Sequence, residues 1–199
     1  MKKLVFGTLA CLLSFNSYAQ KYEIKVKVSS LHDSVIYLYQ HFANDGTYTP
    51  IDTTKLDKNG VGTFHKKKTL SQGMYALALT RKYVAEILIG TKQSFAIEVD
   101  TAEIVKSARF VNSPENTNYY KFMNYLAGKS IEQRKLTGSL KTMKNKALKD
   151  STITAIKALD AQVHSYFQTT QQENPNTMLA VYVKAMVEPT IPEFPRDAL

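Results

Sequence analysis

The stretch TYTPIDTTKLDKNGVGTFHKKKTLSQGMYALAL, from Thr47 to Leu79, decides the fold. It contains three runs that suit β-strands, separated by two turns. Asp57-Lys58-Asn59-Gly60 is the clearest turn, because asparagine and glycine accept the positive φ values that tight turns need. The sequence therefore predicts a hairpin in which residues 61–67 pair with residues 48–56.

Strand-like segments flank this stretch on both sides. In residues 21–28, apolar side chains alternate strictly with charged ones, which is the pattern of a strand with one face in water. Further strands are predicted at residues 34–42, 73–80, 84–90, 94–99 and 108–111. Several short strands joined by turns are typical of an antiparallel β-sandwich, here over residues 20–112.

Residues 113–188 have helical spacing instead. Ser113-Pro114-Glu115 supplies a hydroxyl cap, a proline at the first helical position and an acid in the first turn. Apolar residues then recur every three or four positions. Gly128 and Gly138 are candidate breaks, and the sequence leaves open whether Asp150-Ser151 separates two helices or lies within one.

The last part of the chain has two segments. Thr177–Val187 is almost entirely apolar, and we expect a short helix that is buried or pressed on a partner. Prolines interrupt residues 189–199, which predicts an extended linker. The predicted fold class is α+β, with an antiparallel β-sandwich followed by a helical segment.

The first 19 residues have the pattern of a cleaved secretory signal. Two lysines precede an apolar run too short to span a bilayer, and Ser17-Tyr18-Ala19 fits a cut before Gln20. The chain's single cysteine, Cys11, lies in this segment; a lipoprotein cut before it fits less well, because Thr8 stands where an aliphatic residue is preferred. We expect a protein of the periplasm or cell envelope without a transmembrane segment.

The motif order in the β region resembles a known family. The residues that carry it are Ile51-Asp52-Thr53, Asn59-Gly60, Thr63-Phe64-His65, Gly73-Met74-Tyr75-Ala76-Leu77, Ile87-Leu88-Ile89 and Phe110-Val111-Asn112-Ser113. This order is similar to the N-terminal β-sandwich domain of unknown function, with its helical linker, in exported thioredoxin-like proteins of the TlpA/ResA-type thiol:disulfide interchange group. In that group the chemistry belongs to a Cys-x-x-Cys motif on a following thioredoxin domain. No such motif occurs here, so no catalytic residue carries over.

Other candidate chemistry is sparse. His32, His41, His65 and His164 do not have the spacing of metal ligands. Asp45, Asp52 and Asp57 lie near turns, where side chain-to-backbone hydrogen bonds are the favoured interpretation. No nucleophile elbow, phosphate loop or dinucleotide fingerprint is present. We therefore predict no enzyme, no cofactor and no metal.

Two groups of residues could bind a ligand. The first is a basic run without any acid, which is either a face for anionic lipids, glycans or proteins or a solvated helix surface; it comprises Arg134, Lys135, Lys141, Lys144, Lys146 and Lys149. The second is an aromatic set that suits a core better than a ligand groove; it comprises Tyr119, Tyr120, Phe122, Tyr125 and Tyr182. The chain's net charge of +9 favours anionic partners, and export argues against nucleic acid.

The predicted function follows the resemblance. We expect a non-catalytic accessory region of an exported thioredoxin-like oxidoreductase, used for docking, dimerisation or substrate presentation. A protein partner or self-association is expected. The alternative is a stand-alone envelope protein that binds an anionic or hydrophobic ligand.

Overall fold

Two four-stranded sheets pack face to face in the computed structural model, which describes residues 22–41, 48–79 and 83–187. One sheet has the order β4-β1-β7-β8, and the other has the order β3-β2-β5-β6. The strands are β1 (Tyr22–Val28), β2 (Val35–His41), β3 (Tyr48–Lys55), β4 (Val61–Lys66), β5 (Gly73–Ala78), β6 (Tyr83–Ile89), β7 (Ser94–Val99) and β8 (Arg109–Val111).

The core lies between the sheets. In β1, Tyr22, Ile24 and Val26 are almost fully buried, while Lys25 and Lys27 on the other face are exposed. This confirms the face predicted from the alternation in residues 21–28. The α+β class and the sandwich are likewise confirmed by the two sheets and the helices that follow them.

Two expectations for the strands were wrong. The Asn59-Gly60 turn forms as predicted, with Gly60 at a φ of +76°, but β3 and β4 belong to different sheets, so the turn links the sheets instead of closing a hairpin. β4 pairs with β1. The sandwich is also not wholly antiparallel, because β1 and β7 run parallel.

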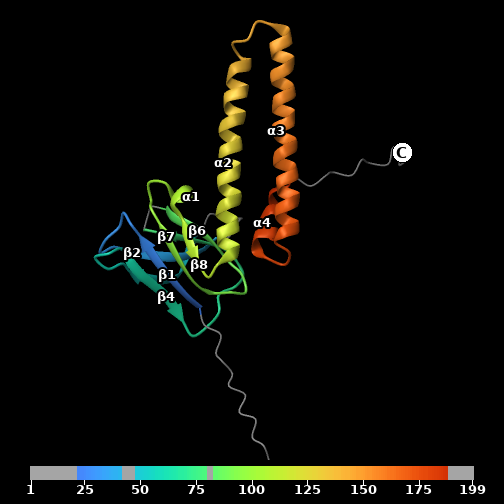
Figure 1. Cartoon of the computed structure of the whole chain (residues 1–199). Coiled ribbons are helices and arrows are strands. Elements are labelled where there is room, and N and C mark those ends of the chain that lie inside the picture. The colour runs from blue at the N-terminus through green and yellow to red at the C-terminus, as the bar shows by residue number, and fades with distance from the viewer. Residues whose placement is uncertain (1–21, 42–47, 80–82, 188–199) are drawn as a thin grey trace, which may run out of the picture.

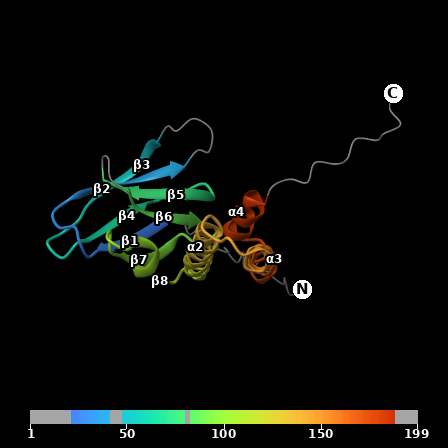
Figure 2. The same cartoon turned by 90° about the horizontal axis from the view of Figure 1, so that it is seen from above.

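The helices form an arm beside the sandwich. A single turn, α1 (Ile104–Ser107), precedes α2 (Pro114–Leu140), α3 (Lys146–Glu173) and α4 (Met178–Met186). α2 and α3 run antiparallel as a hairpin about 40 Å long, and Figure 1 shows that its upper half extends well beyond the sandwich. Seen from above in Figure 2, α2 lies next to the sandwich and α3 on the side of α2 away from it.

The helix boundaries settle what the sequence left open. Neither Gly128 nor Gly138 interrupts α2, and Asp150-Ser151 lies inside α3. The apolar α4 is buried on one side only: Leu179 and Val183 are inaccessible, whereas Val181 is 57% exposed. The predicted signal segment 1–19, Asp45 and residues 189–199 lie outside the described residues.

Candidate functional site

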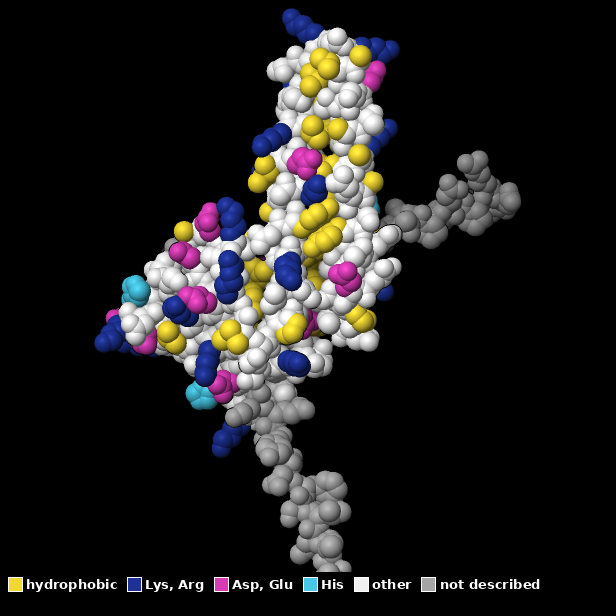
Figure 3. Space-filling model, viewed as in Figure 1, with side chains coloured by type: hydrophobic (Ala, Val, Ile, Leu, Met, Phe, Trp, Pro, Cys, Tyr) yellow, Lys and Arg dark blue, Asp and Glu magenta, His cyan; other side chains and the backbone are white. Residues whose placement is uncertain are grey.

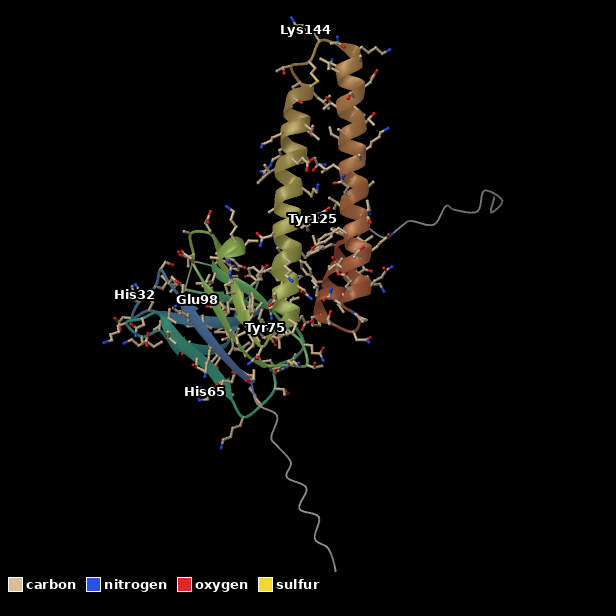
Figure 4. All side chains as sticks on the ribbon, viewed as in Figure 1. His32, His65, Tyr75, Glu98, Tyr125 and Lys144 are labelled. Carbon is tan, nitrogen blue, oxygen red and sulfur yellow. The ribbon has the colours of Figure 1, made fainter. Side chains whose placement is uncertain are left out.

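The six basic residues predicted to form an anion-binding face come together at the free end of the hairpin. They form the distal basic cluster, which consists of Arg134 and Lys135 near the end of α2, Lys141 and Lys144 in the connection, and Lys146 and Lys149 in the first turn of α3. All six are exposed. Figure 3 shows Lys and Arg side chains projecting at the top of the arm, and Figure 4 labels Lys144 there.

The local sequence explains why the chain reverses at this point. Lys141 ends α2, and Asn145 begins α3 by accepting a hydrogen bond from the Leu148 backbone N–H at 3.2 Å. The first turn of α3 contains Lys146 and Lys149 and no acid. Because the positive end of the helix dipole lies here, lysines destabilise the start of α3 and acids would stabilise it. The lysines at the start of α3 are therefore not there to stabilise the helix.

The described acids near the cluster are not paired with it, although exposed Asp150 follows Lys149 directly on α3. Among the residues that the structure describes, none of the six cations lies within ion-pair distance of a carboxylate. Glu132, on α2 below the cluster, pairs with Lys129 at 3.2 Å, and Asp160 accepts a hydrogen bond from the Gln133 amide at 3.3 Å. Residues 134–149 contain six basic residues and no acid, so they carry most of the chain's net charge of +9.

Exposed aliphatic side chains lie within the cluster and just below it on the arm. Ile131 is 48% exposed, Leu148 57% and Ile153 43%. On α2, Arg134 and Lys135 follow Ile131 by three and four positions, so all three lie on one side of the helix. The free end of the hairpin is therefore both basic and partly apolar.

The aromatic set predicted from the sequence lies at the other end of the hairpin. Tyr119, Tyr120 and Phe122 are at most 5% exposed, which confirms the interpretation that they belong to the core. Tyr125 and Tyr182 are half-buried. Tyr125 points from α2 toward α3 in Figure 4 and packs on Tyr166 with ring centroids 3.8 Å apart. These aromatic contacts hold the two helices together next to the sandwich.

The arm is fixed to the sandwich by polar side chains that the sequence did not single out. The amide of Asn116, 1% exposed, accepts a hydrogen bond from the Leu88 N–H at 2.7 Å and donates one to the Leu88 carbonyl at 2.8 Å. Leu88 lies on β6, an edge strand, so the amide takes the place of a neighbouring strand. No spacing in the sequence marks Asn116 as different from the other asparagines near it.

Glu115 joins three parts of the same junction. Its carboxylate accepts hydrogen bonds from the backbone N–H groups of Met178 and Leu179, and it therefore caps the start of α4. The same carboxylate lies against Gly90, where a Cβ atom would come within 2.3 Å of Oε2. The first turn of α2 thus fixes both α4 and the end of β6.

Glu86 of β6 accepts two further hydrogen bonds at the junction. The Tyr119 hydroxyl donates a 3.0 Å hydrogen bond to its carboxylate, and the Tyr120 hydroxyl donates a 3.0 Å bond to its backbone carbonyl. Burial raises the pKa of both tyrosines, and the nearby Glu86 charge raises each pKa further. Both hydroxyls therefore keep their protons at neutral pH and act as donors between α2 and the sheet.

The remaining predicted residues do not form a site. His32, His65 and His164 are exposed, and Figure 4 shows His32 and His65 at separate places on the sandwich. The side chain of His41 lies outside the described part of the chain. No three His, Cys, Asp or Glu side chains among the described residues are placed to hold a metal ion.

The two predicted aspartates that the structure describes have different roles, and only one of them stabilises a turn. Asp57 does stabilise a turn, since its Oδ1 accepts hydrogen bonds from the Asn59 and Val61 N–H groups at 2.8 and 2.9 Å. The turn interpretation was wrong for Asp52, which lies within β3 and accepts a hydrogen bond from the Tyr22 hydroxyl of the opposite sheet. It serves to join the sheets.

Comparisons with known proteins identify no family for this chain. No family model matches the chain, and no curated protein matches it. One solved structure with detectable similarity is a DUF3823 family protein from Parabacteroides merdae, at 12% identity and a TM-score of 0.25; the match covers 40% of this chain and 44% of that one. That likeness carries no argument about function, and it provides no link to thioredoxin-like proteins. In the described residues, no helix is long and apolar enough to cross a membrane.

Proposed function

We propose that this chain is an exported, non-catalytic binding module of the cell envelope. In this proposal the sandwich is a base, the α2–α3 hairpin is a stiff arm, and the distal basic cluster is the contact surface for an anionic partner. The observation that carries the proposal is the gathering of six exposed cations, without carboxylate partners among the described residues, at the end of an arm that stands clear of the sandwich.

The junction supports this role mechanically. Asn116 binds the β6 backbone, and Glu115 caps α4, so the lower end of the hairpin has a fixed direction. A surface at the tip of a fixed arm is presented at a constant height and angle. Less ordering entropy is then lost when a partner binds.

A charge-reversal experiment tests the proposal. The combined change Lys141→Glu, Lys144→Glu and Lys146→Glu alters only exposed side chains, so the fold should remain. With dextran sulfate as a soluble polyanionic probe, affinity should fall by about tenfold or more, because the three reversals leave the cluster with three positive and three negative charges and so remove its net attraction for an anion. Binding by the unchanged protein should also weaken as salt is added.

The control for this experiment carries the same change in charge on the sandwich. Lys58, Lys68 and Lys92 are exposed and lie far from the arm tip in the fold. Replacing these three with glutamate should have much less effect on the affinity for dextran sulfate. Equal losses in the two triple variants, or no loss in the arm variant, would show that the distal basic cluster is not a binding surface.

A second candidate function is favoured by exposed apolar residues on α4 and just after it. Val181, in the middle of the helix, is 57% exposed, and Met186 and Val187, at its end, are 41% and 39% exposed, so a partner domain could cover part of this apolar surface. Together with the motif order in the β region, this supports an accessory role beside a thioredoxin-like domain. The isolated chain should then show no thiol reductase or oxidase activity, and activity in that assay would contradict both candidate functions.

A further inference from the structure

The free end of the hairpin combines two features that a soluble anion would not require together. One is the distal basic cluster, and the other is the set of three exposed aliphatic side chains, Ile131, Leu148 and Ile153. Ile153 lies four positions after Lys149 and four before Lys157, so cations stand on either side of it along one face of α3. Ile131 has Arg134 and Lys135 beside it on α2.

We infer that this end of the hairpin binds the surface of a membrane that contains anionic phospholipids. The inference rests on the proposed function, because it names the class of anion that the distal basic cluster contacts. The cations meet lipid phosphates, and Leu148, in the first turn of α3, enters the boundary between headgroups and acyl chains. Ile153 and Ile131 lie seven and nine residues below the helix ends, so they reach the headgroups when the arm tilts against the membrane. Lysine and arginine beside exposed aliphatic residues are the composition of surface-bound membrane segments.

The shape of the arm favours a flat partner over an enclosed ligand. The six cations lie on two helix ends and on the turn between them, which form the protruding end of the hairpin (Figure 1). The groove between the helices is lined by Leu126, Gln133 and Leu159 among others, and none of the six cations lines it. A flat surface at this end can lie near several of these charges at once, with those in the turn and the first turn of α3 the nearest, whereas a small anion could contact only a few of them.

The orientation of the arm allows this contact. The hairpin extends past the sandwich, so a plane touching its end would not meet the sandwich first (Figure 1). The surface of the arm tip in Figure 3 shows both basic and apolar side chains. Attraction between this end and an anionic surface falls off within a Debye length, so binding should be reversible and sensitive to salt.

The first test compares the binding of three proteins to vesicles. Vesicles of phosphatidylcholine mixed with phosphatidylglycerol should bind the unchanged protein, and vesicles of phosphatidylcholine alone should bind it far less. The variant with Lys141, Lys144 and Lys146 changed to glutamate should lose about 100-fold or more in partitioning. The variant Ile131→Ser, Leu148→Ser and Ile153→Ser should lose about tenfold and should bind dextran sulfate as well as the unchanged protein does.

These two variants separate the inference from the proposed function. If the serine variant binds anionic vesicles as tightly as the unchanged protein, or if no vesicle is bound while dextran sulfate is, the membrane inference is overturned and anion binding stands. If the glutamate variant keeps its affinity for dextran sulfate, the proposed function fails as well. Circular dichroism of both variants checks that the helices are retained.

The second test uses the absence of tryptophan from the chain. Leu148→Trp places a single tryptophan at the arm tip, and Val61→Trp places one at an exposed position of the sandwich. Anionic vesicles should shift the emission of the tip tryptophan to shorter wavelength and leave that of the sandwich tryptophan unchanged. A shift in neither protein, or equal shifts in both, would overturn the inference.

Discussion

The hydroxyl of Tyr22 donates a 2.6 Å hydrogen bond to Oδ2 of Asp52, and this bond crosses from one sheet of the sandwich to the other. Lys66 Nζ, in the same sheet as Tyr22, lies 3.1 Å from Oδ1 of the same carboxylate. The Thr53 N–H also donates to Oδ1 at 2.9 Å. The Asp52 carboxylate therefore joins β3 to β1 and β4. Among the described residues, no backbone ladder pairs β3 with either of these strands.

Removing this carboxylate should destabilise the sandwich. Asp52→Ala leaves the buried Tyr22 hydroxyl without its acceptor, and we expect a loss of about 1–3 kcal/mol in the free energy of unfolding, measured with urea. Asp150→Ala, at an exposed site inside α3, is the control and should change stability by less than about 0.5 kcal/mol. Equal losses in the two variants would contradict the role given to Asp52.

Asp52 should also make the stability of the protein depend on pH in acid. Burial by itself would raise the pKa of Asp52, but hydrogen bonds from Tyr22, Lys66 and Thr53 outweigh burial and hold the pKa below its ordinary value of 3.8. A carboxyl with a lowered folded pKa stabilises the protein above the unfolded pKa and loses that effect as pH falls through the folded pKa. The stability difference between the unchanged protein and Asp52→Asn should therefore shrink below about pH 3.8. A stability difference that stays constant until the protein unfolds in acid would argue against a lowered pKa of Asp52 in the folded protein.

Alkaline pH should act on the junction between the arm and the sandwich. Burial and the Glu86 charge raise the pKa of Tyr119 above its ordinary value of 10.0. A group with a raised folded pKa contributes stability below the unfolded pKa, and this contribution is lost as pH rises toward the folded pKa. The free energy of unfolding should thus fall above about pH 10, and Tyr119→Phe should reduce the steepness of that fall. An unchanged slope in Tyr119→Phe would show that Tyr119 does not titrate on unfolding.

Two glycines provide a matched comparison of packing. At Gly90 a Cβ atom would meet the Glu115 carboxylate, so Gly90→Ala must displace the cap of α4 and should cost about 1–3 kcal/mol. At Gly128, inside α2, nothing lies within 4 Å of a new Cβ atom. Gly128→Ala should therefore stabilise the protein by about 0.5–1 kcal/mol, as alanine does in exposed helices. Thermal unfolding of both variants checks the signs of the two stability changes. A stabilised Gly90→Ala would contradict the close contact between Gly90 and the Glu115 carboxylate.

The sequence predicted local features better than it predicted long-range pairing. Strand positions and the Asn59-Gly60 turn follow from alternation and turn chemistry, which depend on neighbouring residues. Which sheet each strand joins depends on contacts between distant residues, and the turn signal is compatible with both a hairpin and a link between sheets. The parallel pairing of β1 with β7 has no signature in either strand alone.

The basic and polar residues of the helical region show the same distinction. Arg134 to Lys149 could be recognised as a charged run, but its position at the free end of the arm depends on where the two helices stop. Asn116 could not be recognised, because its role comes from an edge strand 28 residues earlier in the chain. Its amide is distinctive only when β6 lies next to it.

Asn116 gives the sharpest test of how the arm is attached. Replacing it with alanine leaves the Leu88 N–H and carbonyl buried without partners, which should cost about 3 kcal/mol and speed hydrogen exchange at the Leu88 amide. Asn118→Ala is the matched control on the same helix: its amide donates to Asn174 at 2.8 Å, between helices, so Leu88 exchange should stay slow. If Asn116→Ala accelerates exchange at Leu88 while α2 and α3 stay protected, the hairpin is a unit that Asn116 fastens to the sheet. If Leu88 remains protected in that variant, the amide does not replace a strand at this edge.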